Sequence, residues 1–593
     1  MMKYILYGLI AILPVFVLPF FPAVFVSPKL ALLAFGLGAA ILVWIIISII
    51  KGSISFTTGG FDLAVVVLML SYLVSTFATK VNKMEAFFFP GTVSFILTGG
   101  VLYFLLNQVR KPGKEGVSFA LVASGVLLSL AIIIGKTKIL PQIPIYYFDP
   151  LGGLVPTVLY LVAISTILIS LFIQQKDLAK RAFLGISALL IVLAVAFSVK
   201  DAPRFLSFKT SWEIMIDSLK ENPLWGVGPG NYPTAFNKYR PLAYNQTDLW
   251  NVKFTSAGNF YFTLITEVGL AGLFALGLLL FLVYKKISIP VAAILILFAI
   301  LPAPPTLIVL MFILLAVSSK EEKSVDVATG RVASIILSGI IVAGIATLTF
   351  FGSKAFAAEI KFKKALDSLS TNNAKATYDN LASAVRLSPG VDRYHASYSQ
   401  IDMALASSIA AKKDITETDR TTISQLISHA INEGKLTVSL NPQRSGNWEI
   451  LARIYRAIMP FAQGADNFAV QTFSQAVVLD PISPNLRINL GGTYFALGRF
   501  DEAIEAFRLA TLTKPDLANA HYNLAIVYRE KKEFKKATDE MNIVLSLVGK
   551  DSADYETATK ELKNIEDLTP PQPVEETNIK PPITLPEDSS PPQ

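Results

Sequence analysis

The sequence predicts an all-α protein in two parts, a polytopic helical membrane domain of about eleven spans and then a solenoid of paired helices. The chain has 593 residues, of which 53% are hydrophobic and 16% are charged. A soluble protein would carry about 25% charged residues. Apolar runs fill residues 1–352, whereas 353–593 has the mixed composition of soluble helices. The chain has no cysteine, and its histidines all follow residue 352, which excludes thiolate chemistry and histidine metal sites from the first part.

Apolar stretches of about 18 residues or more predict helices that cross a bilayer. They are 4–26, 29–50, 61–79, 86–108, 117–135, 152–174, 182–199, 257–284 and 332–352. A further stretch, 288–319, is interrupted by LPAPP at Leu301–Pro305. We interpret it as two short spans joined by a proline turn, because a hairpin keeps the flanking lysines on one side; one kinked helix is the alternative. Glu85 stands beside Lys83 at a span end, where the two are expected to form an interfacial pair.

Basic residues between spans favour the cytoplasmic side. With Lys3 inside, that side collects Lys51, Lys114, Lys176, Lys180, Arg181, Lys285, Lys286, Lys320, Lys323 and Arg331. The domain 1–352 then lies in the cytoplasmic (inner) membrane, and its large loop 200–256 is extracytoplasmic, like everything after residue 352. The net charge of +8 is spread over loop ends, so no nucleic acid partner is implied.

Residues 353–550 are expected to form an extracytoplasmic helical domain with an internal repeat. One copy of its motif is carried by Leu490, Gly491, Tyr494, Ala503, Phe507, Ala510 and Pro515. The motif returns after about 34 residues from Leu524, and begins earlier at Trp448. It resembles the tetratricopeptide (TPR) repeat, most clearly over 445–545. Residues 551–593 are expected to hold the end of the last helix and a disordered tail, since the sequence from Thr569 is rich in proline and acidic residues.

The stretch ENPLWGVGPGNYPTAFNKYRP, residues 221–241, combines glycines, prolines, aromatics and cations. TSWEIMIDSLKEN before it predicts an amphipathic interfacial helix over 211–221, capped by Thr210 and Glu213. Glycines permit positive φ and a close approach of the backbone, and amides exposed in such a turn can bind an anion. Cations bind phosphate oxygens. A nucleotide loop is excluded, because no G-K-[ST] follows and no strand precedes.

SWEIMIDSLKENPLWGVGPGNY, then YRP, then GNFYFTLITEVGLAGL resemble the signature of the O-antigen ligase and polymerase superfamily. The specific part of the resemblance covers about residues 204–275. The resemblance implies transfer or polymerisation of glycan from a polyprenyl-diphosphate carrier at the outer face of the membrane. It implies no cofactor, nucleotide or metal. The implied partners are the carrier-linked glycan, the lipid bilayer, and a protein or glycan acceptor held by the repeats.

The resemblance also implies residue roles. Arg240 would bind the diphosphate during catalysis, and Asn259 and Glu267 would line the site beneath the loop. Substrate-binding roles would fall on Lys209, Trp212, Gly226, Gly228, Gly230, Asn231, Tyr239, Trp250, Lys253 and Asn259. Glu267 lies within an apolar span, where a carboxylate is a functional candidate.

One departure from the family pattern keeps other hypotheses open. Ligase members place a histidine before the asparagine that opens the next span, and this chain has Gly258 there. Either a carboxylate such as Asp248 or Glu267 replaces that histidine as the catalytic base for the acceptor hydroxyl, or the chemistry is polymerase-like, or the site is inactive. The competing hypotheses are a non-enzymatic scaffold whose repeats recruit envelope proteins, and a transporter of lipid-linked sugars. A transporter would be expected to contain broken helices, and beyond 288–319 the sequence indicates none.

Overall fold

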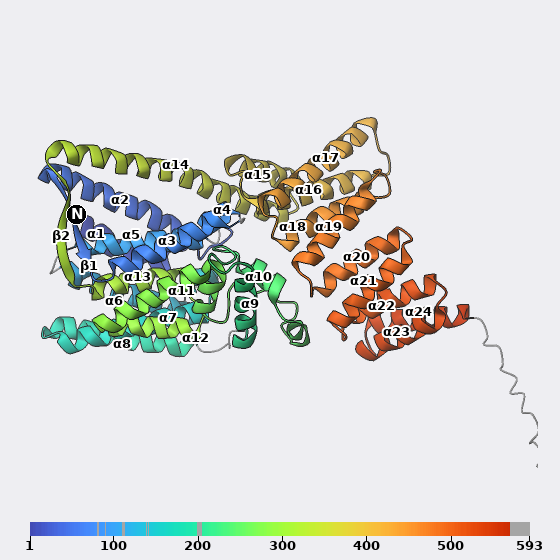
Figure 1. Cartoon of the computed structure of the whole chain (residues 1–593), viewed down its shortest axis with the longest axis horizontal. Helices are drawn as coiled ribbons and strands as arrows, with labels where there is room; N and C mark the ends of the chain where they lie inside the picture. The colour runs from blue at the N-terminus through green and yellow to red at the C-terminus, as the bar shows by residue number, and fades with distance from the viewer. Residues whose placement is uncertain are drawn as a thin grey trace, which may run out of the picture. The chain divides into compact units, whose positions relative to one another are not determined.

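The structure, a computed structural model, describes residues 1–79, 82–88, 91–109, 113–137, 139, 142–198 and 204–569. It is almost entirely helical (Figure 1). The first part contains α1 (Met2–Ile12), α2 (Ser27–Lys51), α3 (Asp62–Ala78), α4 (Lys83–Phe88), α5 (Thr92–Asn107), α6 (Gly113–Thr137), α7 (Leu154–Gln174), α8 (Leu178–Ser198), α9 (Phe208–Glu221), α10 (Tyr232–Tyr239), α11 (Phe260–Lys286), α12 (Ile289–Ile300), α13 (Pro305–Ser318) and α14 (Arg331–Ser370). Its strands are β1 (Ser53–Gly59) and β2 (Glu321–Thr329).

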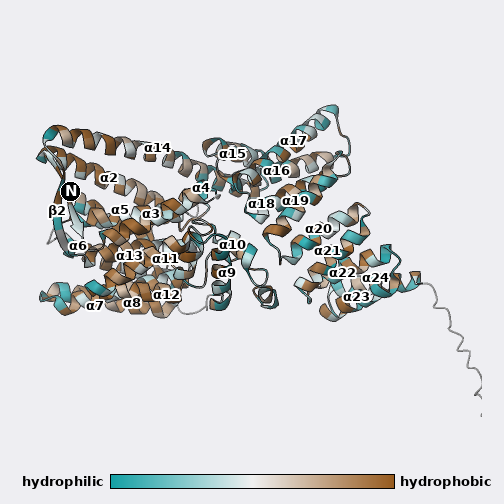
Figure 2. Cartoon of the chain, in the orientation of Figure 1, coloured by the Kyte–Doolittle hydropathy of each residue, from teal (hydrophilic) through white to brown (hydrophobic). Residues whose placement is uncertain are grey.

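The apolar helices gather in one bundle, in which hydrophobic residues dominate α1–α8 and α11–α13 (Figure 2). Within the described residues, six helices are long and apolar enough to cross a membrane: α2, α6, α7, α8, α11 and α14. Shorter apolar helices occupy the other predicted spans. The helical class is therefore as expected, and the number of spans stays a prediction.

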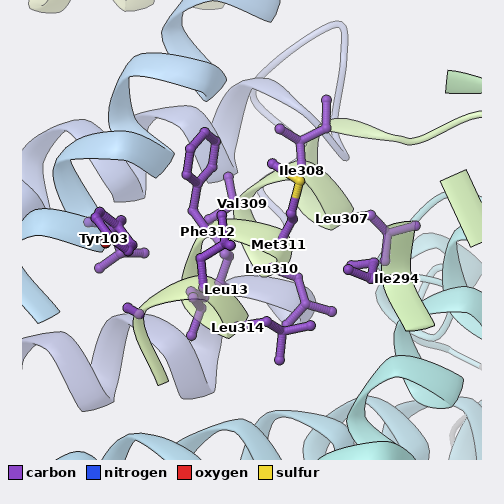
Figure 3. Close-up of a cluster of buried hydrophobic side chains, with 14 of the residues drawn as sticks. Leu13, Tyr103, Ile294, Leu307, Ile308, Val309, Leu310, Met311, Phe312 and Leu314 are labelled. Carbon is purple, nitrogen blue, oxygen red and sulfur yellow. The ribbon is translucent and has the colours of Figure 1, made fainter. Parts of the chain in front are cut away.

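Helix α13 is the centre of this bundle. Every side chain from Thr306 to Ala316 is buried, so the helix is enclosed on all sides. Its leucines, isoleucine and phenylalanine pack with Leu13, Tyr103 and Ile294 from three other segments (Figure 3). The interrupted stretch 288–319 forms the two expected short helices, and the Ser288 hydroxyl donates to the Ser318 hydroxyl at 2.7 Å. The outer ends of α12 and α13 therefore meet, as in a hairpin.

Three local expectations are corrected. The helix expected over 4–26 ends at Ile12, because Pro14 has no amide to continue it. Residues 53–59 and 321–329, expected as loops, form a two-stranded antiparallel ribbon with Phe56 opposite Val325. The interfacial helix begins three residues earlier than expected, since the Ser207 side chain, not Thr210, accepts the capping bond from the Thr210 amide at 3.1 Å.

The repeats form helix pairs. Their helices are α15 (Ala374–Leu387), α16 (Asp392–Ala410), α17 (Glu417–Leu440), α18 (Ser445–Ile458), α19 (Ala465–Leu479), α20 (Pro484–Ala496), α21 (Phe500–Thr513), α22 (Ala518–Glu530), α23 (Phe534–Leu547) and α24 (Ala553–Leu568). Small residues such as Ala503 and Ala537 are fully buried where helices approach closely. Helix α24 is a separate helix, not the end of α23 as expected, and 570–593 lie outside the described residues.

The chain divides into two compact units, Met1–Leu486 and the residues from Arg487 on. The expected boundary at 352 falls inside α14, which continues unbroken for 40 residues, about 60 Å at about 1.5 Å per residue. Helices α15–α19 therefore belong to the same compact unit as the apolar bundle.

Candidate functional site

Helix α11 is broken beneath the glycine-rich loop. Gly269 has φ 69° and ψ −153° inside it, so the helical bonds from Leu270 and Ala271 to the residues four positions earlier are not made. The loop replaces them. The Val227 and Gly228 amides donate to the Thr266 and Glu267 carbonyls at 3.0 and 2.9 Å. In return, the Leu270 and Ala271 amides donate to the Pro223 and Leu224 carbonyls at 2.9 and 3.2 Å.

Only glycine fits where the loop meets the break. A Cβ on Gly226 would lie 2.4 Å from the Thr266 carbonyl oxygen, and one on Gly269 would lie 2.6 Å from the Gly226 nitrogen. Both have positive φ, which adds strain for any other residue. The amides of Val227 and Gly228 are therefore used inside the protein and do not form the open anion nest that the sequence suggested.

Glu267 is the carboxylate that this arrangement presents. It follows buried Leu264 by three residues, precedes the break by two, and is 3% exposed. The backbone amides of Gly230 and Tyr232 direct hydrogen bonds at it. Its side chain lines a cavity of about 630 Å³, together with Tyr72, Phe260 and a proline-rich segment at 302–305. The cavity is largely apolar, with Glu267 as one of its few charged groups.

A second charged group in this cavity comes from the repeats. Arg444, which precedes α18, makes a two-pronged contact with Glu85 at 2.8 and 3.0 Å. Its Nη1 also lies 3.2 Å from Asp392 Oδ2, and Asn447 holds the same Asp392 oxygen at 2.8 Å. The pKa of Glu85 is raised to about 7, because the effect of burial outweighs the lowering effect of the Arg444 charge. Glu85 is therefore paired with the repeats, not with Lys83 at an interface as expected.

Arg240, the predicted diphosphate ligand, is bound to a carboxylate of the repeats. Its Nη1 lies 2.7 Å from Asp480 Oδ1, and the two side chains are 4% and 0% exposed. Lys253 approaches the other Asp480 oxygen at 3.2 Å. Nearby, the Asn245 side chain donates to the Ile482 carbonyl at 2.7 Å. In this structure these two cations therefore fasten the loop 204–256 to the turn after α19, and neither lines the cavity.

The remaining candidates have varied places. Asn259 caps α11 by accepting from the Phe262 amide at 2.8 Å, and buried Asn231 bonds within its own turn to the Pro229 carbonyl. Gly230 lines the cavity, whereas Gly226 and Tyr239 line a separate groove of about 510 Å³. The Gly228 amide donates to the Glu267 carbonyl at the break in α11. Trp250 is half-buried and lines neither hollow. The other three candidates, Lys209, Trp212 and Asp248, are exposed and also line neither hollow.

Gly258, where the resembled family has histidine, has no room for a side chain. A Cβ there would lie 2.4 Å from the Leu206 carbonyl oxygen, and its amide donates to the Ser211 hydroxyl at 2.9 Å. Of the two carboxylates proposed in the histidine's place, Glu267 faces the cavity and Asp248 does not. Within the described residues, no group of three or more acidic or histidine side chains is arranged to hold a metal ion.

Sequence reasoning missed the contributions of Glu85, Arg444 and Asp480. Glu85 and Arg444 are 359 positions apart, and no motif marks either of them. A carboxylate at the end of an apolar stretch was the one available signal for Glu85.

The comparisons with known proteins concern the repeats. Residues 491–532 match the TPR repeat family. MamA from Desulfovibrio magneticus RS-1 is 14% identical over 32% of this chain and 94% of its own, with a TM-score of 0.27. TTC0263, a TPR protein of Thermus thermophilus, is 17% identical over 35% of this chain and 99% of its own, with a TM-score of 0.26. YrrB, a TPR protein with an unusual peptide-binding site, is 16% identical over 34% and 92%, with a TM-score of 0.26. No curated protein matches the chain. The C-terminal part thus contains TPR repeat sequence, as predicted.

Proposed function

We propose that the chain is a multi-pass protein of the cytoplasmic membrane that transfers or polymerises glycan from a polyprenyl-diphosphate carrier at the outer face. Insertion in a bilayer is supported by the outer surfaces of the bundle. Large apolar side chains there face outward, including Ile186 at 61%, Val332 at 72% and Ile336 at 61% exposure. Water would disfavour such a surface, and lipid chains would cover it.

The observation that carries the enzymatic proposal is Glu267. A buried carboxylate in an apolar span is costly unless it serves a function, and this one lines a cavity large enough for several sugar or isoprenoid units. Together with the resemblance of residues 204–275 to glycan ligases and polymerases, this favours a general base placed beside a lipid-linked substrate.

The proposed step is a displacement at the anomeric carbon of the carrier-linked sugar. An acceptor hydroxyl attacks that carbon, Glu267 takes the hydroxyl proton, and the bond from the carbon to the diphosphate oxygen breaks. The diphosphate leaves with the bonding electrons on its lipid carrier. Arg240 and Lys253 are both engaged with Asp480, so Arg204, an exposed cation that directly precedes Phe205 of the cavity wall, becomes the nearer phosphate contact.

The test uses the full chain in proteoliposomes with a polyprenyl-diphosphate-linked glycan, and it measures release of glycan from the carrier. Glu267→Gln keeps an acceptor for the Gly230 and Tyr232 amides but loses the base, so transfer should fall about 10²–10⁴-fold. Asp217→Asn on the exposed side of α9 is the matched control and should transfer normally. Full activity in Glu267→Gln, or a loss in Asp248→Asn instead, would remove Glu267 from the proposed role.

The scaffold alternative rests on the TPR match, because such repeats present a concave surface to partners. In either function, we propose that the repeats engage a protein or glycan acceptor. The transporter alternative gains support from broken α11, a feature of many transporter sites. The loop amides close that break, however, which favours a fixed site over a moving one. Wild-type protein that releases no glycan would leave the scaffold and the transporter, and uptake of a labelled lipid-linked sugar would separate those two.

A further inference from the structure

A second hollow lies on the other side of the glycine-rich loop. It has a volume of about 510 Å³ and is formed by the end of α3, the end of α9, the segment Pro223–Val227, helix α10 and the turn that carries Gln443. Its polar and aromatic composition differs from the largely apolar cavity that contains Glu267.

The charges in the groove neutralise one another. Lys238 Nζ lies 2.6 Å from Glu221 Oε2, and the Tyr239 hydroxyl also directs a hydrogen bond to Glu221. Among the described residues that line the groove, no other ionisable acid or base is present. A phosphate or another charged ligand would therefore meet no uncompensated opposite charge there, and the groove suits a neutral ligand.

Three polar side chains in the groove are uncommitted. Within the described part of the chain, the side chains of Asn222, Thr234 and Gln443 make no hydrogen bond to protein. Two amides and one hydroxyl can together donate and accept several hydrogen bonds. Their ideal counterpart is a ligand that carries many hydroxyl groups.

Two aromatic side chains complete the groove. Trp225 is half-buried, and its carbonyl oxygen is fixed by the Ser75 hydroxyl of α3 at 2.7 Å. Tyr239 faces the same hollow from α10. Rigid aromatic rings provide apolar contact area with little loss of side-chain entropy. Aromatic rings with free amides nearby suit a sugar ring, which has an apolar face and a polar edge.

The groove and the cavity are lined by neighbouring residues of the same two segments. Gln443 lines the groove and the next residue, Arg444, lines the cavity; likewise Val227 lines the groove, and Gly230 of the same loop lines the cavity. A saccharide whose end reacts beside Glu267 would therefore have a second set of contacts in the groove. We propose that this groove binds a neutral, hydroxyl-rich stretch of the acceptor saccharide, an inference that rests on the proposed glycan transfer.

The test measures binding without transfer. Fluorescently labelled full-length protein in detergent is applied to a printed array of bacterial polysaccharides and fragments, neutral and acidic, with unrelated peptides alongside. Wild type should bind at least one neutral saccharide. Trp225→Ala should weaken that binding about tenfold or more, since the few residues that dominate binding are enriched in tryptophan. Gln443→Ala, which removes no bond to protein and should fold normally, should weaken it severalfold. Phe461→Ala, an exposed aromatic in the turn after α18, is the matched control and should bind as wild type.

Wild type that binds no neutral saccharide, or that prefers peptides or acidic glycans, would overturn the proposal. Unchanged binding in both groove variants would do so as well. The two proposals fail separately. Saccharide binding that depends on Trp225 without any release from the carrier would refute the enzymatic function and leave the groove. Normal transfer with groove variants that bind like wild type would refute the groove alone.

Discussion

The buried pair of Arg240 and Asp480 gives the sharpest quantitative prediction. Each residue directly follows a helix, α10 or α19, and together they join the loop that contains α10 to the repeats. Both side chains are almost fully buried, so removing one leaves the other charge without a partner away from water. Such a loss costs about 3–5 kcal/mol. Lys253 adds little to this, because it is 56% exposed and screened by solvent.

Arg240→Ala should therefore open the contact between α10 and α19. The measurement is amide hydrogen exchange of both helices in the full chain, with α24 as the internal reference. A cost of about 3–5 kcal/mol corresponds to exchange roughly a hundred to several thousand times faster, at about 1.36 kcal/mol per tenfold. Glu505→Ala is the matched control, since both members of its pair with Arg508 are about half exposed, and it should change exchange little. Unaltered exchange in Arg240→Ala would refute the docking role.

A double variant separates docking from phosphate binding. Replacing both members of a buried pair with apolar residues is often neutral, so Arg240→Met with Asp480→Leu should restore most protection in α10 and α19. If Arg240 acts only through docking, glycan transfer should return with that protection. If it contacts the diphosphate, as the family resemblance implies, transfer should stay absent while docking recovers.

The remaining predictions concern the loop, a repeat histidine and topology. Gly226→Ala should speed exchange around the α11 break by at least about tenfold, because positive φ alone costs about 1–3 kcal/mol in other residues, whereas Gly277→Ala, which meets open space, should not. Burial lowers the pKa of His521, but its bonds with Glu540 and the Pro515 carbonyl outweigh this and raise it overall. This stabilisation is complete below the unfolded value of about 6.5 and is lost as pH rises through the folded value. Thermal melts of wild type should show that decline with pH, and His521→Gln should flatten it; an equal decline in both would contradict the assignment. A reporter enzyme that works only outside the cytoplasm should be active when it is fused after Ser370. An inactive fusion would contradict the extracytoplasmic position of the repeats.

The sequence predicted the elements whose signals are local. Long apolar stretches located the bundle helices, and the proline turn at 301–305 separated α12 from α13 because proline there cannot continue a helix. Buried small residues such as Ala503 and Ala537 marked the repeats, since close packing of helix pairs leaves no space for larger side chains. The sequence did not predict the ribbon between β1 and β2, because the two strands are far apart in the chain and strand pairing has no local marker.

The same distinction applies to the candidate site. Glu267 was found from sequence because a carboxylate inside an apolar stretch is locally conspicuous. The partners of Arg240 and Glu85 were not, because each ion pair joins the first part of the chain to a turn of the repeats. Nothing in the composition of a turn such as NPQRSGNW indicates which distant carboxylate it will meet. Arg240 and Glu85 were therefore named from the sequence, whereas their pairing with Asp480 and Arg444 required the fold.

The geometry also changes the reason for the glycines of the loop. The sequence suggested that these glycines fold the backbone over a phosphate. In the structure, however, the amides of Val227 and Gly228 donate to the carbonyls of Thr266 and Glu267. Buried carbonyls freed by a broken helix need replacement partners, and the loop can approach closely enough to supply them only because neither Gly226 in the loop nor Gly269 in the helix carries a side chain. The break and the loop thus depend on each other, and together they hold Glu267 at the cavity wall. A stiff loop is required here because it completes the hydrogen bonding of apolar helix α11 at the point where that helix carries its carboxylate.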